Sequence, residues 1–186
     1  MIKKINLILI MVMVIGTLYF VLFSYDSSRL LTYLAVAPVL VAPVILRKTK
    51  YRLCDFELLI YYIFIFLADF LGCVVNLYNL VGWYDLFTHF LSGIFTFWIG
   101  IFILDKIQFR GKNILFDLFF SISVVMLVAS VWEFFEFGAD ILLDMDLQHD
   151  LDTGVVDTMT DMLVALLGGI LSIGGYYASK KRNYFE

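Results

Sequence analysis

The sequence predicts an all-α membrane protein, a bundle of six transmembrane helices with both termini in the cytoplasm. Its composition excludes an ordinary soluble domain, because 62% of the 186 residues are hydrophobic, whereas soluble domains are about half apolar. Six segments are apolar over roughly the 17–25 residues that a membrane span requires. The 13 Lys and Arg residues are also distributed unevenly about these segments, as they are in multispan membrane proteins.

The six predicted spans follow one another with short connections, and no internal repeat or linker divides residues 1–186, so we expect one integral membrane domain. The spans run over residues 5–24, 30–46, 56–76, 85–104, 114–138 and 157–178. The first is interpreted as a retained span, and a secretory signal is the alternative, because no small-x-small cleavage site follows its long apolar run. The second carries Pro38 and Pro43, which predict a kinked helix; a broken or re-entrant helix is the alternative.

The basic residues predict the orientation of the chain. Twelve of the 13 precede the first span, follow the sixth, or lie in the connections after the second and fourth spans. They are Lys3, Lys4, Arg47, Lys48, Lys50, Arg52, Lys106, Arg110, Lys112, Lys180, Lys181 and Arg182. Only Arg29 belongs to the other side. Because cytoplasmic loops carry the excess of Lys and Arg, both termini are predicted to be cytoplasmic.

Small and sulfur-containing residues add two expectations. Cys54 and Cys73 lie at opposite ends of the third span, about 28 Å apart at 1.5 Å of rise per residue, so they are not expected to form a disulfide. The sixth span contains Gly168, Gly169 and Gly174. We interpret these glycines as sites of close helix packing, because no strand precedes them as it would in a phosphate-binding loop.

Seven ionisable side chains form three stripes in the last three spans. They are Asp85 and His89, then Glu133, Glu136 and Asp140, then Asp157 and Asp161. Spacings of three or four residues place each set on one helix face. The alternating directions of the spans place all seven at one depth, near the extracytoplasmic face, where we expect them to converge. Ionisable groups inside a span are energetically costly and indicate a functional site.

The charge of these stripes requires an explanation. Six carboxylates with a neutral histidine carry a charge of −6, and burial of even one unpaired carboxylate costs several kcal/mol. A water-filled vestibule, shared protons, or one or two divalent cations would each remove this cost. Oxygen ligands with one imidazole suit Mg, Mn, Ca or Fe more than structural Zn. We therefore predict a divalent metal site, occupied by Mg, Mn, Ca, Fe or Zn.

The residue types suggest a role for each member of the stripes. The predicted metal ligands are His89, Glu133, Glu136, Asp157 and Asp161. Asp85 or Asp140 is expected to orient His89 or to act as a general base. In the alternative interpretation Asp85 and Asp157 are helix caps, which the helix dipole favours. Capping does not explain Glu133, which lies near a helix C-terminus.

Other polar residues are weaker candidates. Asp69, Asn76 and Asn79 are expected at a similar depth, where they would support the ligands. The acidic stretch 144–154 lacks the spacing and the terminal Glu of an EF-hand loop, so we interpret it as a solvated loop. Its His149 is an alternative, mobile ligand.

Three motifs resemble those of the YjdF-like family of uncharacterised bacterial inner-membrane proteins. They are Asp85-x-x-x-His89-Phe90-x-x-Gly93, Trp132-Glu133-x-x-Glu136, and Asp157-Thr158-x-x-Asp161-Met162 followed by Gly168. The resemblance covers roughly residues 83–170. A weaker similarity is to the VanZ-like membrane proteins, from which the chain departs at Leu86 and at Gly154 and Val155. The resemblance implies a multispan protein of the bacterial cytoplasmic (inner) membrane and implies no reaction.

Three functions are consistent with these patterns. The first is a metal-dependent hydrolase or transferase for a lipid or lipid-linked substrate. The second is a cation or proton transporter, although Asp117 is the only acid near the inner end of the fifth span. The third is an accessory protein whose bundle is held together by metal. The expected partner is the lipid bilayer, and no nucleic-acid partner is expected.

Overall fold

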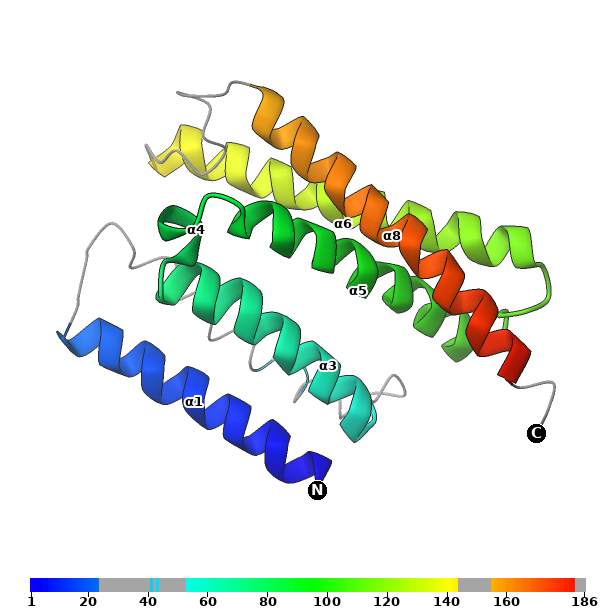
Figure 1. Cartoon of the computed structure of the whole chain (residues 1–186), viewed down its shortest axis with the longest axis horizontal. Coiled ribbons are helices and arrows are strands. Elements are labelled where there is room, and N and C mark those ends of the chain that lie inside the picture. The colour runs from blue at the N-terminus through cyan, green and yellow to red at the C-terminus, as the bar shows by residue number, and fades with distance from the viewer. Residues whose placement is uncertain (24–40, 42, 44–52, 144–154, 183–186) are drawn as a thin grey trace. The chain divides into compact units, whose positions relative to one another are not determined.

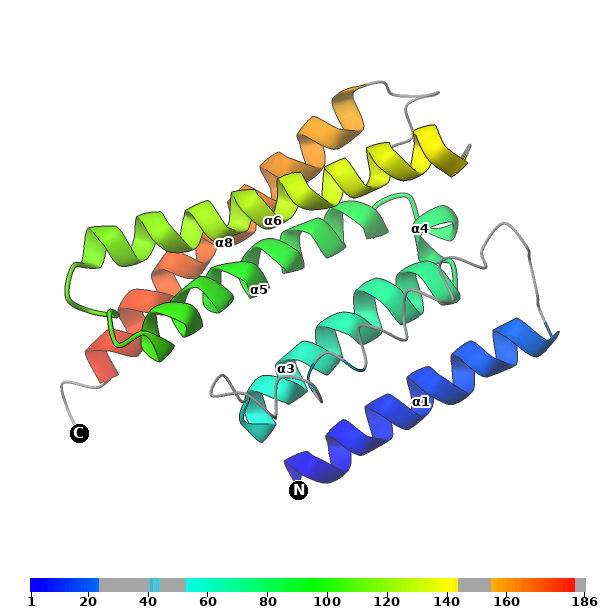
Figure 2. The same cartoon turned by 180° about the vertical axis from the view of Figure 1, so that it is seen from behind.

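The computed structural model describes residues 1–23, 41, 43, 53–143 and 155–182 (Figures 1 and 2). Most of these residues are helical, and none belongs to a strand. The helices are α1 (Ile2–Phe23), α3 (Asp55–Ile65), η2 (Phe66–Val74), α4 (Leu77–Leu80), α5 (Tyr84–Lys106), α6 (Ile114–Leu143) and α8 (Val155–Arg182). The chain divides into two compact units, Met1–Tyr84 and Asp85–Glu186. The all-α prediction is confirmed for the described residues, while the prediction of one integral membrane domain stays a prediction.

Five helices in the described part of the chain are long and apolar enough to cross a membrane. They are Ile2–Phe23, Asp55–Val74, Tyr84–Lys106, Ile114–Leu142 and Val155–Ala178. Each overlaps one predicted span. The largest difference is in α6, which continues beyond the predicted end at residue 138 to Leu143 because its last residues remain apolar apart from Asp140. The predicted span 30–46 lies outside the described residues.

In the N-terminal unit, α1 packs along α3 and η2. Its Met13 is fully buried in an apolar core, whose other buried members are Leu58, Tyr62, Ile65, Phe70 and Val74. Asn6 Nδ2 donates a hydrogen bond to the carbonyl oxygen of Asp55 at 3.0 Å, and Gly16 faces the ring of Phe70 so closely that a Cβ would overlap it. These contacts place the beginnings of α1 and α3 together, so the two helices are parallel (Figure 1).

The third span changes from an α-helix to a π-helix within the membrane-spanning segment. At its start, Glu57 Oε2 accepts a hydrogen bond from the Cys54 backbone N–H at 2.6 Å, which satisfies a donor that the first turn leaves open. Beyond Ile65 the chain widens into η2, which contains Asp69. The Leu67 carbonyl there accepts a hydrogen bond from Tyr84 Oη at 2.8 Å. The hydropathy pattern did not predict this change, since the apolar run continues through both helix types.

Asn76 and Asn79, predicted as supporting residues of the site, have a local structural role. Asn76 adopts the left-handed conformation at φ 76° and begins α4, a conformation that Asn tolerates better than most residues. Asn79 Nδ2 donates a hydrogen bond to Asn76 Oδ1 at 2.7 Å. The pair therefore stabilises the turn that follows η2.

In the C-terminal unit, α5, α6 and α8 pack through glycines, as membrane helices do where small residues allow close approach. A Cβ on Gly93 of α5 would overlap the Ala165 carbonyl of α8, and a Cβ on Gly168 of α8 would overlap the Phe90 carbonyl of α5. A Cβ on Gly100 of α5 would lie 2.7 Å from the Ser121 Cα of α6, and one on Gly169 of α8 would lie 3.0 Å from Val125 Cγ2 of α6. The expectation that the glycines of the last span serve packing is confirmed for the pair at 168 and 169. A Cβ on Gly174 would meet nothing within 4 Å.

Candidate metal centre

Three side chains from α5 and α8 lie close enough together to bind one metal ion. His89 Nε2 is 3.5 Å from Asp85 Oδ1, one turn earlier on α5, and 3.9 Å from Asp161 Oδ2 on α8. One ligand atom from each residue lies within 4.8 Å of the other two. Atoms that bind one ion at about 2.0–2.6 Å are at most about 5 Å apart. The spacing of the three groups therefore fits a shared divalent ion.

The packing of α5 on α8 explains why His89 and Asp161 meet. Gly93, four residues after His89, contacts Ala165, four residues after Asp161. The two helices run in the same direction (Figure 1). The residues four positions before the contact on each helix, His89 and Asp161, therefore lie side by side. The glycine contact thus sets the register of the site.

Helix α6 brings Glu133 to the same place by a similar register. It runs opposite to α8 (Figure 2), and the contact of Val125 with Gly169 lies eight residues from Glu133 along α6 and eight residues from Asp161 along α8. Glu133 is only 3% exposed. It lies close enough to Asp161 for the two carboxylates to interact electrostatically.

Glu136 and Asp157 also belong to this group of interacting charges. Glu136 interacts electrostatically with Glu133, Asp85 and Asp161, and Asp157 interacts with Asp161 and His89. Six of the seven predicted side chains are thus near one another, and three of them form the ligand group.

Asp140 is the seventh predicted residue, and it lies farther from the ligand group. It follows Glu133 by seven residues, about 10 Å along the helix axis, and is half-buried. Asp69 belongs to the N-terminal unit, and its predicted supporting role stays a prediction. His149 and the rest of the stretch 144–154 lie outside the described residues.

The burial of the cluster makes its negative charge costly. Asp161 and His89 are 2% and 6% exposed, and Asp161 Oδ1 is buried with no hydrogen-bond partner among the described residues. An uncompensated buried carboxylate costs several kcal/mol. No Lys or Arg occurs in α6, and those of α5 and α8 lie at the opposite ends of these helices. A bound cation would remove this cost.

Short-range hydrogen bonds hold part of the cluster in place. Trp132 Nε1 donates to Glu136 Oε1 at 2.7 Å, one turn apart on α6. The hydroxyls of Thr88 and Ser92 donate to the backbone carbonyls of Asp85 and His89 at 2.8 and 2.9 Å. Trp132 therefore orients a carboxylate of the cluster. Its i, i+4 spacing from Glu136 is visible in the sequence, but its supporting role was missed.

A second buried polar group, which the sequence pattern did not indicate, lies at the opposite end of α6. Asp117 is fully buried, and its Oδ2 accepts hydrogen bonds from Tyr176 Oη at 2.6 Å and from the Gly111 backbone N–H at 2.7 Å. Gly111 adopts φ 79° in the connection before α6, a conformation available to glycine without strain. The group ties α6 to α8 and to this connection. No local pattern indicates the Tyr176 contact, since 59 residues separate it from Asp117.

An apolar layer separates this second group from the candidate metal centre. Buried side chains of all three helices pack between them: Phe97, Ile101, Val125, Ala129 and Ala165. The buried polar side chains at this level are the hydroxyls of Thr96, Ser121 and Ser172. Among the described buried residues, no charged side chain lies between the two polar regions of the C-terminal unit.

The comparisons with known proteins identify a family but no function. The model of a family described as predicted membrane protein (DUF2238) matches residues 5–182, and the YjdF-like proteins are part of this family. No curated protein and no solved structure matches the chain. The similarity to VanZ-like proteins stays a prediction. The chemistry of the site must therefore be argued from its own residues.

Proposed function

This chain belongs to the DUF2238 family of predicted membrane proteins, and we propose that it is a metal-dependent membrane enzyme. The proposed reaction is hydrolysis or group transfer on a lipid or lipid-linked substrate. The observation that carries the proposal is the ligand group of Asp85, His89 and Asp161, in which Asp161 Oδ1 is buried without a hydrogen-bond partner among the described residues. A structural carboxylate is normally satisfied by the protein itself.

The arrangement supports a division of roles among the residues. His89, Asp161 and Asp85 would hold the ion. Glu133, Glu136 and Asp157 would complete its coordination or compensate its positive charge. When bound, a divalent ion activates a water molecule or polarises a substrate oxygen. Asp85 is half-buried, and its Oδ1 is 3.5 Å from His89 Nε2, so of the two predicted bases it is the better placed to accept a proton at the ion.

The helices that carry the site support a lipid substrate. All of its residues lie on helices that are long and apolar enough to span a membrane. No Lys or Arg is present at the described ends of α5, α6 and α8 that carry the site. This disfavours direct binding of a phosphate group by side chains, because phosphate recognition normally uses such cations. The binding of phosphate would therefore depend on the metal.

Conduction of ions or protons is the less favoured function. A conducting protein needs polar groups along a path, and ionisable residues in spans typically mark such a path. Among the described buried residues, no charged side chain lies between the candidate metal centre and Asp117. An accessory protein with a structural metal is the remaining alternative, and the activity measurement below distinguishes it.

We also propose six spans in a bacterial inner membrane, with both termini in the cytoplasm. α1 and α3 are parallel, as the first and third spans of this proposed arrangement would be, and this supports the proposal. The distribution of Lys and Arg supports the orientation. In this arrangement the candidate metal centre faces the extracytoplasmic side.

Cys54 provides a native probe of this orientation. It is an exposed free cysteine at the start of α3, which the proposal places on the cytoplasmic side. In a Cys73→Ala variant, a membrane-impermeant maleimide is expected to label inverted membrane vesicles at least about tenfold more than intact spheroplasts, as the positive-inside rule requires. Strong labelling of intact spheroplasts would instead place this end of α3 outside.

Lipid turnover tests the proposed activity. Purified protein, reconstituted in vesicles of bacterial lipid extract with Mg, Mn, Ca, Fe or Zn, is expected to form new lipid products detectable by mass spectrometry. Asp161→Asn is expected to lower the rate at least about 100-fold, since even residues that only support metal ligands commonly contribute 10–100-fold. Chelation by EDTA is expected to stop turnover in the wild type.

Asp105→Asn is the matched control for this experiment. Asp105 is an exposed acid at the other end of α5, where it pairs with Arg110 at 2.8 Å, so its loss is expected to leave turnover unchanged. A metal-loaded protein that changes no lipid would contradict the enzyme and favour the accessory protein. Metal-dependent ion flux into the same vesicles would favour the transporter.

A further inference from the structure

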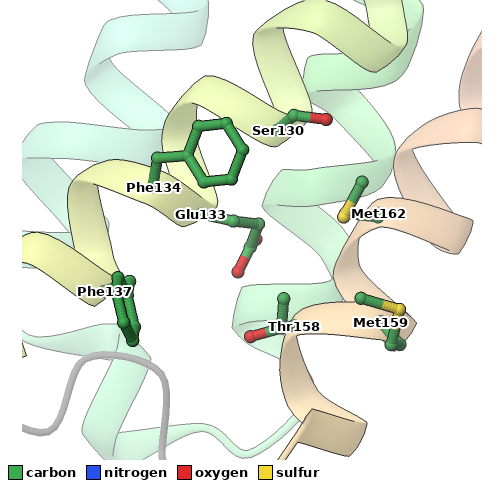
Figure 3. A pocket seen from close by; sticks show the side chains of 7 residues that line it. All are labelled: Ser130, Glu133, Phe134, Phe137, Thr158, Met159 and Met162. Carbon is green, nitrogen blue, oxygen red and sulfur yellow. The ribbon is translucent and has the colours of Figure 1, made fainter.

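A largely apolar groove lies between α6 and α8 and has Glu133 in its lining (Figure 3). Its volume is about 400 Å³, within the roughly 300–1,000 Å³ of small-molecule sites. The groove is lined by Ser130, Glu133, Phe134, Phe137, Thr158, Met159 and Met162. The carboxylate of Glu133 projects between the two helices (Figure 3), so the groove reaches a residue that interacts with Asp161.

The groove follows from the sizes of the residues along the two helices. At Gly169 the helices approach closely, since a Cβ there would lie 3.0 Å from Val125 Cγ2. Toward the metal centre, larger side chains such as Phe134 and Met162 replace the glycine and line an open space (Figure 3). Helices that touch at a small residue and diverge beyond it leave such a space between them.

The surroundings of the groove indicate the chemistry of its occupant. Its walls are exposed, with Phe134 71%, Phe137 54% and Met159 47% accessible, and they belong to membrane-spanning helices. A bilayer contacts such walls with hydrocarbon chains rather than water. The carboxylates of Glu133 and Asp161 at the inner end repel an anion, and α6 contributes no Lys or Arg. The part of the occupant that enters the groove is therefore apolar and uncharged.

We propose that this groove binds the acyl chain of a membrane lipid and thereby selects an acyl lipid as the substrate. This inference rests on the proposed function and specifies its substrate class. The side chains of Phe134, Phe137 and Met159 contact the chain, and the groove leads the adjoining uncharged ester group of the lipid toward Glu133. Met159 and Met162 suit this role because flexible thioether side chains adapt to apolar ligands of varied shape.

Photocrosslinking tests the groove directly. The full-length protein is reconstituted in vesicles of phosphatidylethanolamine and phosphatidylglycerol that contain a trace of phosphatidylethanolamine with a diazirine in its acyl chain. Crosslinks at the groove residues of α6 and α8 are expected to exceed those at Phe119 at least about fivefold, the excess expected for bound over passing lipid. Phe119 is a suitable reference because it is 74% exposed on the same helix α6 and does not line the groove.

Two tryptophan variants complete the test. Met159→Trp fills the groove and is expected to reduce its crosslinks and the lipid turnover at least about fivefold, while bound metal is retained. Leu163→Trp adds the same bulk one turn away on α8, at a residue that is 60% exposed and does not line the groove. It is expected to leave crosslinks, turnover and metal unchanged.

The outcomes separate this inference from the proposed function. Equal crosslinking at the groove and at Phe119, or crosslinks that join the groove to another segment or to a second copy of the chain, overturns the acyl-chain site. If metal-dependent turnover persists in that case, the proposed enzyme stands. If the groove crosslinks lipid but the protein shows neither bound metal nor lipid turnover, the proposed enzymatic function is wrong. The groove would then bind lipid, but not as a substrate.

Discussion

Replacement of Asp161 by asparagine is expected to abolish the binding of a divalent metal. Asp161 is 2% exposed and 3.9 Å from His89 Nε2, so its carboxylate cannot be replaced by a neighbour without repacking α8. The asparagine side chain has nearly the same volume but carries no charge. Loss of a ligand is expected to reduce metal affinity by about 100-fold or more, since supporting residues alone contribute 10–100-fold.

The measurement is elemental mass spectrometry of protein purified in detergent and incubated with Mg, Mn, Ca, Fe or Zn. The wild type is expected to hold near-stoichiometric metal, and His89→Ala is expected to lose it. Asp105→Asn removes an exposed acid at the far end of α5 and is expected to retain the wild-type content. Asp140→Asn is also expected to retain metal, because Asp140 lies about 10 Å beyond Glu133 along α6.

Three results would contradict this metal centre. A wild type that binds none of the five metals would leave the carboxylates neutralised by protons or by water. Equal metal loss in Asp105→Asn would mean that the metal is bound non-specifically by acidic groups. Loss in Asp140→Asn alone would move the centre toward the end of α6.

Replacement of Gly93 by alanine is expected to destabilise the C-terminal unit by about 1–3 kcal/mol, the usual magnitude for overpacking in a close-packed interior. The added Cβ would overlap the Ala165 carbonyl, which is backbone and cannot rotate away. Helices α5 and α8 would have to separate. Because His89 and Asp161 each lie four residues before this contact, metal binding is expected to weaken in the same variant.

Thermal unfolding in detergent, followed by circular dichroism, measures this effect. Gly174→Ala and Gly138→Ala are matched controls on α8 and α6, since a Cβ at either position would meet nothing within 4 Å. They are expected to be neutral or to stabilise by about 0.5–1 kcal/mol, because alanine is the better helix former. Wild-type stability in Gly93→Ala would contradict the close α5–α8 contact and the register derived from it.

Some features of the site could be predicted from local sequence, and others could not. The stripes of Asp85 with His89 and of Asp157 with Asp161 follow from helix periodicity alone, which requires no partner helix. Helix periodicity does not predict that Asp140 lies outside the ligand group. Asp140 shares a face of α6 with Glu133, but it lies too far along the helix axis. The Asp117–Tyr176 hydrogen bond joins residues 59 positions apart, so only packing reveals it.

The sequence by itself determined the all-α class and the limits of five spans, because the thickness of a bilayer sets the length of an apolar helix. It also determined which side chains share a helix face. Only the tertiary structure decided which helix faces are in contact and in which register along the helix axes. That register depends on backbone contacts at Gly93, Gly100 and Gly168, and each contact joins residues on different helices. A single helix period contains no information about them.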